Sequence, residues 1–365
     1  MSHEFHSLTV SEVVKETADA TSVYFEVPEN LSGQYAYQAG QYLTLRFELN
    51  GEDVRRAYSL CTSPVEGRVG VNVKRVNKGL VSNHINDNLK PGDQVQVMQP
   101  DGTFGLAFSH DLKRDYYFFA AGSGITPIMS LIKTIVEEEP MSRCHLLYGN
   151  RNEDSIIFKN EIDALQQKYA GQIDVVHTLS SPNRQKAGGL KGMFSKGKIS
   201  WTGWQGRING TRIDTFLENH PKVGKEAHYF VCGPGAMIDT IIDHLEKKGV
   251  GEDRIHAEHF VSSSGPAIGS ADGVNSEVTV HLAGQTYQVN VPADKTILDV
   301  LIKEKVDAPY SCTSGACSTC VGKVITGEVA MDACYALDDD EVKEGYILVC
   351  QSRAKSPTVE LTFDT

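Results

Sequence analysis

The amino-acid sequence predicts a multidomain protein in which an antiparallel β-barrel, a doubly wound parallel α/β domain and a small α+β domain follow one another. Three observations predict this order: short alternating strands near the N-terminus, strands that alternate with helices in the middle, and a hairpin with a short helix near the C-terminus. We place the barrel at residues 1–110, the α/β domain at 111–262, a linker at 263–275 and the last domain at 276–365.

The N-terminal region consists of short segments in which apolar and polar residues alternate. Residues 22–27, 42–47 and 69–73 are clear examples, and turn sequences such as Asn50-Gly51 separate them. Alternation with a period of two turns one face of each strand toward a core. Many short strands of this kind are typical of an antiparallel barrel.

From residue 116 the pattern changes to apolar strands that alternate with helices. We expect strands at 117–121, 144–148, 173–177, 229–231 and 255–258, and helices at 125–138, 155–169 and 236–248. This alternation predicts parallel strands with helices on both faces of the sheet. The Gly- and Lys-rich residues 188–204 are interpreted as a surface insertion, with a mobile flap as the alternative.

The C-terminal part begins after a segment that has the composition of a linker. Residues 262–270 are small and turn-forming. Beyond them, 278–280 and 287–291 indicate a hairpin, and 296–305 a short helix. We therefore expect a compact α+β unit at the end of the chain.

Composition and charge exclude several classes of partner. The 365-residue chain has a net charge of −12, which argues against binding to nucleic acid or anionic lipid. No stretch approaches the roughly 18 uninterrupted apolar residues of a membrane span, and the N-terminus lacks the profile of a signal peptide. We expect a cytoplasmic protein with no membrane segment. The acidic run at 338–341 is either a solvated face or a docking surface for a basic partner.

Four of the eight cysteines have the spacing of metal ligands: Cys312, Cys317, Cys320 and Cys350. Three of them share one short loop of small residues, and such spacing is that of plant-type [2Fe–2S] proteins. Backbone N–H groups of such a loop can point at the sulfur atoms and stabilise the reduced cluster. A four-cysteine zinc site is the alternative, although structural zinc usually takes its ligands as two short Cys pairs. Cys334 falls outside the spacing, and we exclude it as a ligand.

The loop around these cysteines resembles that of a known family. Residues 309–324, Pro-Tyr-Ser-Cys-Thr-Ser-Gly-Ala-Cys-Ser-Thr-Cys-Val-Gly-Lys-Val, are similar to the cluster loop of plant-type ferredoxins. The resemblance implies that 276–365 is a β-grasp-like α+β ferredoxin domain that binds a [2Fe–2S] cluster.

A second resemblance concerns the end of a barrel strand. Arg56, Ala57, Tyr58 and Ser59 are similar to the Arg-x-Tyr-Ser flavin motif of the ferredoxin–NADP⁺ reductase superfamily. It implies that Arg56 pairs with a flavin phosphate and that Tyr58 contacts the junction of the ribityl chain and the ring. Ser59 would then lie near flavin N5.

Another stretch of this chain resembles the second flavin segment of that superfamily. In that segment a glycine turn opens a helix, and the N-terminal N–H groups of the helix can hold pyrophosphate. The matching residues are Val73, Lys74, Arg75, Gly79, Leu80, Val81 and Ser82. Because this turn is intact, the resemblance favours FAD over FMN.

The nicotinamide site is expected at the carboxyl ends of the parallel strands. Its candidates are a glycine loop that precedes a helix, a Cys-Gly-Pro segment and one arginine: Gly122, Gly124, Thr126, Pro127, Cys232, Gly233, Pro234 and Arg151. By resemblance, Glu258 and Phe260 end this domain, and Phe260 stacks on the flavin. Ser59, Cys232 and Glu258 are then the catalytic trio, which orients the reactants and relays protons. The choice between NADH and NADPH stays open.

The order of the three domains resembles that of the oxygenase reductases of the phenylacetyl-CoA epoxidase and 3-ketosteroid 9α-hydroxylase type. It implies electron flow from NAD(P)H to FAD, to the [2Fe–2S] cluster and then to a partner protein, the terminal oxygenase of a mono-oxygenase, epoxidase or ring-hydroxylase system. Two alternatives are kept. One is a reductase for a non-oxygenase acceptor, such as a hybrid-cluster protein or a desaturase, and the other is a non-redox zinc-binding module.

Overall fold

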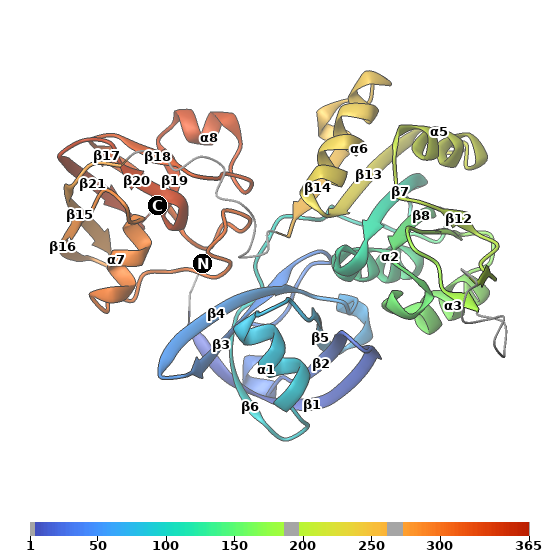
Figure 1. Cartoon of the computed structure of the whole chain (residues 1–365), viewed down its shortest axis with the longest axis horizontal. Helices are drawn as coiled ribbons and strands as arrows, with labels where there is room; N and C mark the ends of the chain where they lie inside the picture. The colour runs from blue at the N-terminus through green and yellow to red at the C-terminus, as the bar shows by residue number, and fades with distance from the viewer. Residues whose placement is uncertain (1–3, 186–196, 261–272, 365) are drawn as a thin grey trace.

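The computed structural model describes residues 4–185, 197–260 and 273–364 and forms three domains (Figure 1). Most of the predicted linker at 263–275 and much of the insertion at 188–204 lie outside the described residues. In the described part, no helix is both long and apolar enough to cross a membrane.

The first domain is an antiparallel barrel, as predicted. Its strands are β1 (Phe5–Thr17), β2 (Ala20–Glu26), β3 (Tyr42–Leu49), β4 (Glu52–Ser59), β5 (Val69–Lys74) and β6 (Gln94–Met98). They pair in the order β4-β3-β6-β1-β2-β5. A bridge between Leu60 and Val71 joins the two edge strands and closes the barrel. Helix α1 (Leu80–Asn88) contributes Val81 and Ile85 to the barrel core.

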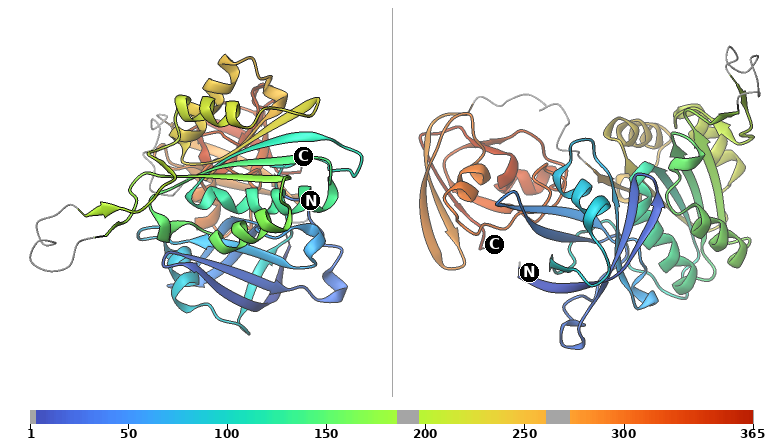
Figure 2. Two further views of the ribbon diagram at one scale, coloured as in Figure 1. Left: turned by 90° about the vertical axis from the view of Figure 1, so that its right-hand side faces the viewer. Right: turned by 60° about the horizontal axis from the view of Figure 1, so that its bottom comes forward.

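The second domain is a parallel sheet with helices on both faces (Figure 2). Its strands are β7 (Arg114–Ala121), β8 (Arg143–Asn150), β9 (Ile173–Leu179), β12 (Trp204–Gln205), β13 (Glu226–Gly233) and β14 (Ile255–His259), in the order β12-β9-β8-β7-β13-β14. A two-stranded ribbon of β10 (Arg184–Gln185) and β11 (Lys198–Ile199) flanks the undescribed insertion.

The alternating side chains of β7 divide the core of this domain in two. Phe118 packs with α2 (Ile125–Glu138) and α3 (Lys159–Lys168), whereas Phe119 packs on the other face with α5 (Gly210–Asn219) and α6 (Gly235–Lys247). This is the period-two burial expected of a strand with two covered faces.

Two details of this domain differ from the sequence-based expectation. Helix α3 begins at Lys159 rather than near 155, because Glu153–Ser155 forms a 3-10 turn and Phe158 adopts a left-handed conformation with φ of 59°. Helix α5 was not expected, although its N-cap signal was present: the Asn209 side chain accepts a hydrogen bond from the Arg212 N–H group.

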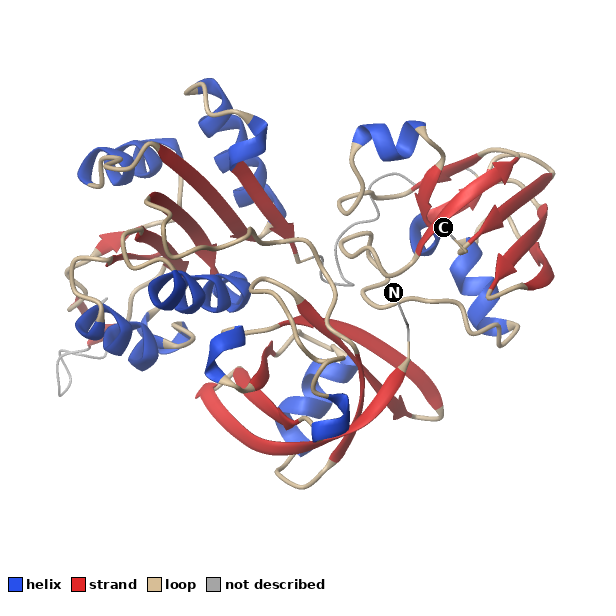
Figure 3. Cartoon of the chain, turned by 180° about the vertical axis from the view of Figure 1, so that it is seen from behind, coloured by secondary structure: helices blue, strands red, loops and turns tan. Residues whose placement is uncertain are grey.

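The third domain has a five-stranded sheet in the order β16-β15-β21-β17-β19, with the short helix α7 (Ile297–Lys303) packed on it (Figure 3). The strands are β15 (Ser276–Leu282), β16 (Gln285–Val291), β17 (Val321–Thr326), β19 (Tyr346–Leu348) and β21 (Thr358–Thr362). Two short strands pair apart from them, β18 (Val329–Met331) and β20 (Ser352–Ala354). The predicted hairpin is β15–β16, and the acidic run forms α8 (Asp339–Lys343).

Buried polar contacts fix the barrel to the α/β domain. The Lys133 ammonium, 8% exposed, donates to the carbonyl oxygen of Cys61 at 3.0 Å and pairs with Glu66 at 3.2 Å. Beside it, the Ser130 hydroxyl donates to the carbonyl oxygen of Thr62 at 2.6 Å. These contacts hold the loop after β4 against α2, so the two domains present a continuous wall to any ligand between them.

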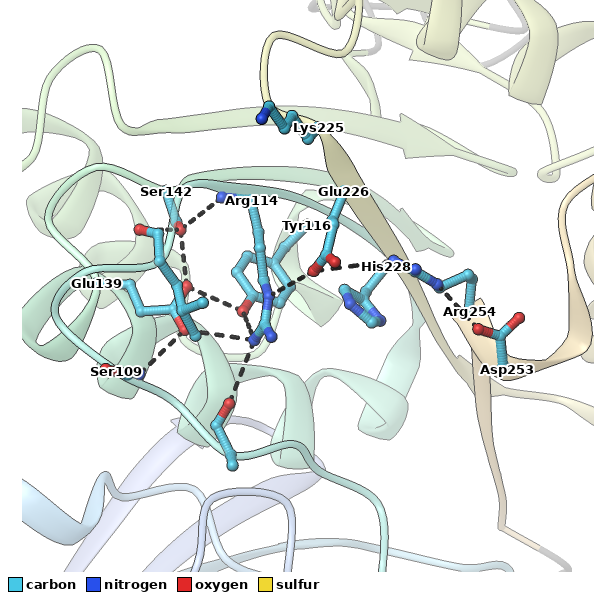
Figure 4. A network of polar contacts seen from close by, with 12 residues as sticks. Ser109, Arg114, Tyr116, Glu139, Ser142, Lys225, Glu226, His228, Asp253 and Arg254 are labelled. Carbon is cyan, nitrogen blue, oxygen red and sulfur yellow. Dashed lines mark hydrogen bonds and ion pairs between the residues drawn. The ribbon is translucent and has the colours of Figure 1, made fainter.

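At the start of β7, a buried carboxylate organises the segment that connects these domains (Figure 4). Glu139 accepts hydrogen bonds from the Tyr116 hydroxyl at 2.9 Å, the Ser142 hydroxyl at 2.7 Å and the Ser109 N–H group at 3.3 Å. Arg114 lies 3.6 Å away and neutralises its charge. A buried carboxylate is stable only when it is satisfied in this way, so the network fixes the path of the chain between the barrel and β7.

Candidate functional site

One pocket opens where the three domains meet. Its walls come from the barrel, from the ends of α/β-domain strands and from the C-terminal domain. The lining residues are Tyr42, Arg56, Ala57, Tyr58, Ser59, Asn72, Lys74, Val76, Gly79, Leu80, Val81, Ser82, Ser123, Thr126, Glu258, His259, Phe260, Cys312, Ser314, Ala316 and Cys317. The fold therefore brings most of the predicted flavin residues together with part of the cysteine loop.

The turn that opens α1 is built for a close approach of backbone. A Cβ atom on Gly79 would lie 2.5 Å from the Ser82 hydroxyl and 2.9 Å from the Val76 side chain, so only glycine fits there. The first N–H groups of α1 receive no side-chain cap from residue 79. A helix N-terminus with unsatisfied N–H groups suits an anionic group such as the pyrophosphate of FAD.

Lys74 supplies a positive charge between the barrel and the nucleotide loop. Its side chain lines the pocket, and a Cβ on Gly122 would lie 3.2 Å from its ammonium nitrogen. Burial lowers the pKa of Lys74, and within the described residues no carboxylate lies within ion-pair distance of it. This cation is available to a phosphate or to a polar edge of a bound cofactor.

The predicted trio converges in the structure. Cys232 on β13 and Glu258 on β14 occupy paired positions of neighbouring parallel strands. The Ser59 hydroxyl donates to Glu258 Oε2 at 3.2 Å, and the Cys232 Sγ lies 3.9 Å from the same oxygen. Residues from two domains thus meet at one carboxyl group.

Electrostatics define the protonation of this trio. Burial raises the pKa of Glu258 to about 8, so its carboxyl group is protonated at neutral pH. Burial and the neighbouring carboxylate raise the pKa of Cys232 well above its usual value, so it is a thiol. A neutral thiol is a poor nucleophile, which agrees with roles in orientation and proton transfer rather than covalent catalysis.

The glycine loop after β7 passes very close to Cys232. A Cβ on Gly124 would lie 2.1 Å from the carbonyl oxygen of Cys232, and Gly122 has a positive φ of 55°. The Tyr148 hydroxyl donates to the carbonyl oxygen of Gly122 at 3.0 Å, and Thr126 caps the loop by donating to Ser123 at 2.8 Å. The loop is thereby fixed at the N-terminus of α2, where a dinucleotide phosphate binds in doubly wound sheets.

The cysteine loop wraps its sulfur atoms with backbone donors. The Ser314 N–H group donates to Cys312 Sγ at 3.4 Å, and the Cys312 N–H group to Cys317 Sγ at 3.5 Å. Gly315 has a φ of 75°, and a Cβ there would lie 2.8 Å from the carbonyl oxygen of Ala333. From outside the loop, the Gln351 amide donates to Cys350 Sγ at 3.8 Å. This donor set suits a cluster that gains negative charge on reduction.

The four cysteines of the predicted ligand set lie together in the structure. Hydrogen bonding with Cys317 and Cys350 lowers the pKa of Cys312, and Cys350 also contacts Cys320, so the four thiols gather in one place. However, among the described residues no three of these thiols lie within 4.8 Å of one another. Thiolates 2.3 Å from a tetrahedral zinc ion would all lie about 3.8 Å apart. The four sulfur atoms are therefore spaced more widely than those of a closed zinc site.

Four contacts between domains hold the cysteine loop against the pocket. The sequence did not reveal them. The Tyr42 hydroxyl group is hydrogen-bonded to that of Thr319 at 2.9 Å, and the Thr44 hydroxyl group donates to that of Ser311 at 2.8 Å. Arg55 pairs with Asp307 at 2.8 Å. The rings of His259 and Tyr335 stack with centroids 4.5 Å apart. These partners lie far apart in sequence, and local patterns carry no signal for their contact.

Other predicted residues lie outside the pocket wall. Val73 is in the barrel core, and Arg75 pairs bidentately with Asp87 on α1. Arg151 is exposed at the end of β8. The remaining ones do not line the pocket: Gly122 and Gly124 lie in the turn after β7, Pro127 in the first turn of α2, Cys232 and Gly233 at the end of β13, and Pro234 directly after it. Their roles toward a cofactor stay predictions.

Comparison with known proteins agrees with this architecture. Family models match in three places: an oxidoreductase FAD-binding domain at residues 7–105, an oxidoreductase NAD-binding domain at 118–243 and a 2Fe-2S iron–sulfur cluster binding domain at 280–355. The structure of phthalate dioxygenase reductase, described as a modular structure for electron transfer from pyridine nucleotides to [2Fe–2S], has a TM-score of 0.60 and 26% identity and covers 98% of each chain.

Two curated relatives match over almost their whole length. A component of 1,2-phenylacetyl-CoA epoxidase from Escherichia coli (strain K12) is 34% identical, covering 99% of this chain and 98% of that protein. The ferredoxin reductase component of 3-ketosteroid-9-alpha-monooxygenase from Rhodococcus rhodochrous is 35% identical, covering 98% and 96%. The chain therefore belongs to the family of NAD(P)H-dependent FAD and [2Fe–2S] reductases that includes these two oxygenase components.

Proposed function

We propose that this chain takes electrons from a nicotinamide dinucleotide and delivers them, one at a time, to the terminal oxygenase of a multicomponent system. A single observation carries the proposal: residues of the flavin motif and of the cysteine loop line the same pocket. A flavin bound there supplies the conversion between two-electron and one-electron transfer. Relatives that serve an epoxidase and a ketosteroid monooxygenase support an oxygenase of one of these types as the acceptor.

The chain's own residues hold the cofactors and control protons. We assign phosphate binding to Arg56, Lys74 and the N-terminus of α1, and nicotinamide phosphate binding to the loop at Gly122. Ser59 and protonated Glu258 present hydrogen-bonding groups on the pocket wall, where they can hold a proton close to the reacting ring. Phe260, 37% exposed on the pocket wall, covers the ring face and moves aside when nicotinamide enters.

The domain limits given above and a cytoplasmic location are part of the proposal. No disulfide joins any of the eight cysteines in the structure, and a reducing compartment keeps cysteines in this state.

Reconstitution tests the function. We expect the purified protein to contain FAD, iron and sulfide and to reduce cytochrome c with NADH or NADPH. Cys350→Ser should abolish cytochrome c reduction while ferricyanide, which accepts electrons from the flavin, is still reduced. A colourless protein, or cytochrome c reduction that survives the loss of Cys350, would refute the relay. Affinity capture followed by turnover with the captured protein then identifies the acceptor. A hybrid-cluster protein or a desaturase as the acceptor would refute the assignment to an oxygenase and leave the relay intact.

A further inference from the structure

A compact group of metal-binding side chains lies at the edge of the parallel sheet where the strands begin. His145 and Asp174 are paired positions near the starts of β8 and β9, and His220 caps the C-terminal end of α5, which packs over β7 (Figure 1). The predicted nicotinamide residues lie at the opposite edge of this sheet, where its strands end, and the flavin residues lie on the barrel. The group is therefore separate from the redox site.

The three side chains are close enough to share one ion. One ligand atom from each of His145, Asp174 and His220 lies within 4.8 Å of the other two, and no other trio in the described part of the chain does this. Nδ1 of His145 is 3.2 Å from Asp174 Oδ2. Nitrogen and oxygen ligands at 2.0–2.2 Å from a tetrahedral zinc ion lie roughly 3.4 Å apart, so the observed spacing is that of an open site that closes slightly on binding.

His145 lies buried within this group. It is 3% exposed, yet neither ring nitrogen makes a directed hydrogen bond within the described residues. Such a buried polar group calls for an explanation.

The atoms behind the two imidazole rings have the arrangement that orients metal-bound histidines. Nε2 of His145 faces Oδ1 of buried Asp115 at 3.7 Å, and this oxygen also lacks a hydrogen-bond partner among the described groups. Nδ1 of His220 lies 2.8 Å from the carbonyl oxygen of Phe216. Histidine ligands usually donate their second N–H group to a carboxylate or a carbonyl. The His220–Phe216 pair has a suitable distance, and Asp115 lies just beyond hydrogen-bond distance of His145. The remaining nitrogens, Nδ1 of His145 and Nε2 of His220, are then the ones left for a metal.

We propose that His145, Asp174 and His220 bind one divalent transition-metal ion of the zinc class, with water at the fourth position. The ion would connect the starts of β8 and β9 to the end of α5. Two imidazoles and one carboxylate prefer zinc-like ions to magnesium or calcium. A protonated His145 held between Asp115 and Asp174 is the competing explanation. It gives His220 no role and predicts no metal binding.

The test uses the protein with its flavin and cluster in place. After treatment with a chelator and desalting, zinc chloride is titrated calorimetrically, and bound zinc is counted against the iron of the cluster. We expect one zinc per cluster. His220→Gln and Asp174→Asn, both at partly exposed positions, should weaken binding at least tenfold while the visible spectra of flavin and cluster stay unchanged.

A matched control comes from the same domain. His244 Nε2 pairs with Asp214 at 2.9 Å, but no third ligand completes a trio there among the described residues. The His244→Gln variant should therefore bind zinc with the same affinity and stoichiometry as the unmodified protein. An absence of bound zinc, or equal affinity in the His220 and Asp174 variants, would overturn the proposal.

Discussion

Replacing Arg55 with alanine tests how the cluster domain is held at the pocket. The guanidinium extends from β4, is 6% exposed, lies over the ring of Tyr310 at 4.4 Å and donates to Asp307 at 2.8 Å. Tyr310 and Asp307 both belong to the C-terminal domain, whereas a third partner, Asp53 at 3.3 Å, belongs to the barrel. A desolvated cation–π contact is worth about 2 kcal/mol. The ion pair adds up to about 1 kcal/mol, because Asp307 is 86% exposed and solvent screens it.

A loss of about 3 kcal/mol corresponds to roughly a hundredfold change in the docking equilibrium. The hydroxyl pairs that remain at this interface contribute about 1 kcal/mol each, so they cannot replace Arg55. We expect Arg55→Ala to slow reduction of cytochrome c about tenfold or more, with ferricyanide reduction by NADH or NADPH changed less than twofold. Stopped-flow absorbance of the cluster after mixing with the dinucleotide measures the affected step directly.

Arg46→Ala is the matched control. Arg46 also pairs with Asp53, at 2.8 Å, but it is 40% exposed and makes no contact with the cluster domain among the described interactions. It should leave both activities within twofold of the unmodified protein. Arg55→Lys keeps the charge without the planar group and should have an intermediate effect. Equal losses of cytochrome c and ferricyanide reduction in Arg55→Ala would refute the docking argument and place the damage in the flavin site beside it.

Three further predictions concern the pocket and the cluster. Glu258 has a pKa of about 8, so ferricyanide reduction should decline as the pH rises through about 8 and the carboxyl group loses its proton. The Glu258→Gln variant is neutral at every pH and should lack this inflection in the pH profile. If the inflection persisted in the variant, it would belong to another group. Phe260→Ala should bind the nicotinamide dinucleotide up to about tenfold more tightly, because a ring stack worth about 1 kcal/mol no longer competes; unchanged affinity in a spectral titration would contradict the stacking role. Cys334→Ser should keep full iron and sulfide content, whereas Cys350→Ser should lose the cluster, and loss of iron in the Cys334 variant would show that the ligand set is wrong.

Local sequence patterns correctly predicted the positions of elements in which nearly all residues are buried. The helix expected at 125–138 is α2, Ile125–Glu138, because nearly all of its residues are buried between the sheet and the barrel. Strand β8 extends beyond the expected 144–148, since backbone pairing continues past the apolar side chains. Helix α5 was missed because its apolar residues, among them Ile213 and Phe216, are few and follow an irregular segment.

The cysteine spacing predicted the cluster ligands, since three of the four share a loop and their geometry is local. The contacts that complete the pocket are not local. Tyr42 and Thr319 are 277 residues apart, and neither belongs to a pattern that names the other. Arg55 was visible only as the residue before the flavin motif, and its burial under Tyr310 depends on how two domains pack. Such pairs follow from tertiary structure, which a single sequence does not display.

The two interfaces of the pocket serve different chemical steps. Lys133 and Ser130 join the barrel to the α/β domain through buried contacts, so Ser59 and Glu258 keep their relative position. Hydride transfer requires that rigidity, because the reacting atoms must align at roughly 3–3.5 Å. Transfer of a single electron to the cluster makes and breaks no covalent bond, so it does not require such alignment across the interface around Arg55. Interfaces of that kind within one chain permit relative motion of the domains, and such motion would let the cluster face the flavin first and the acceptor protein afterwards.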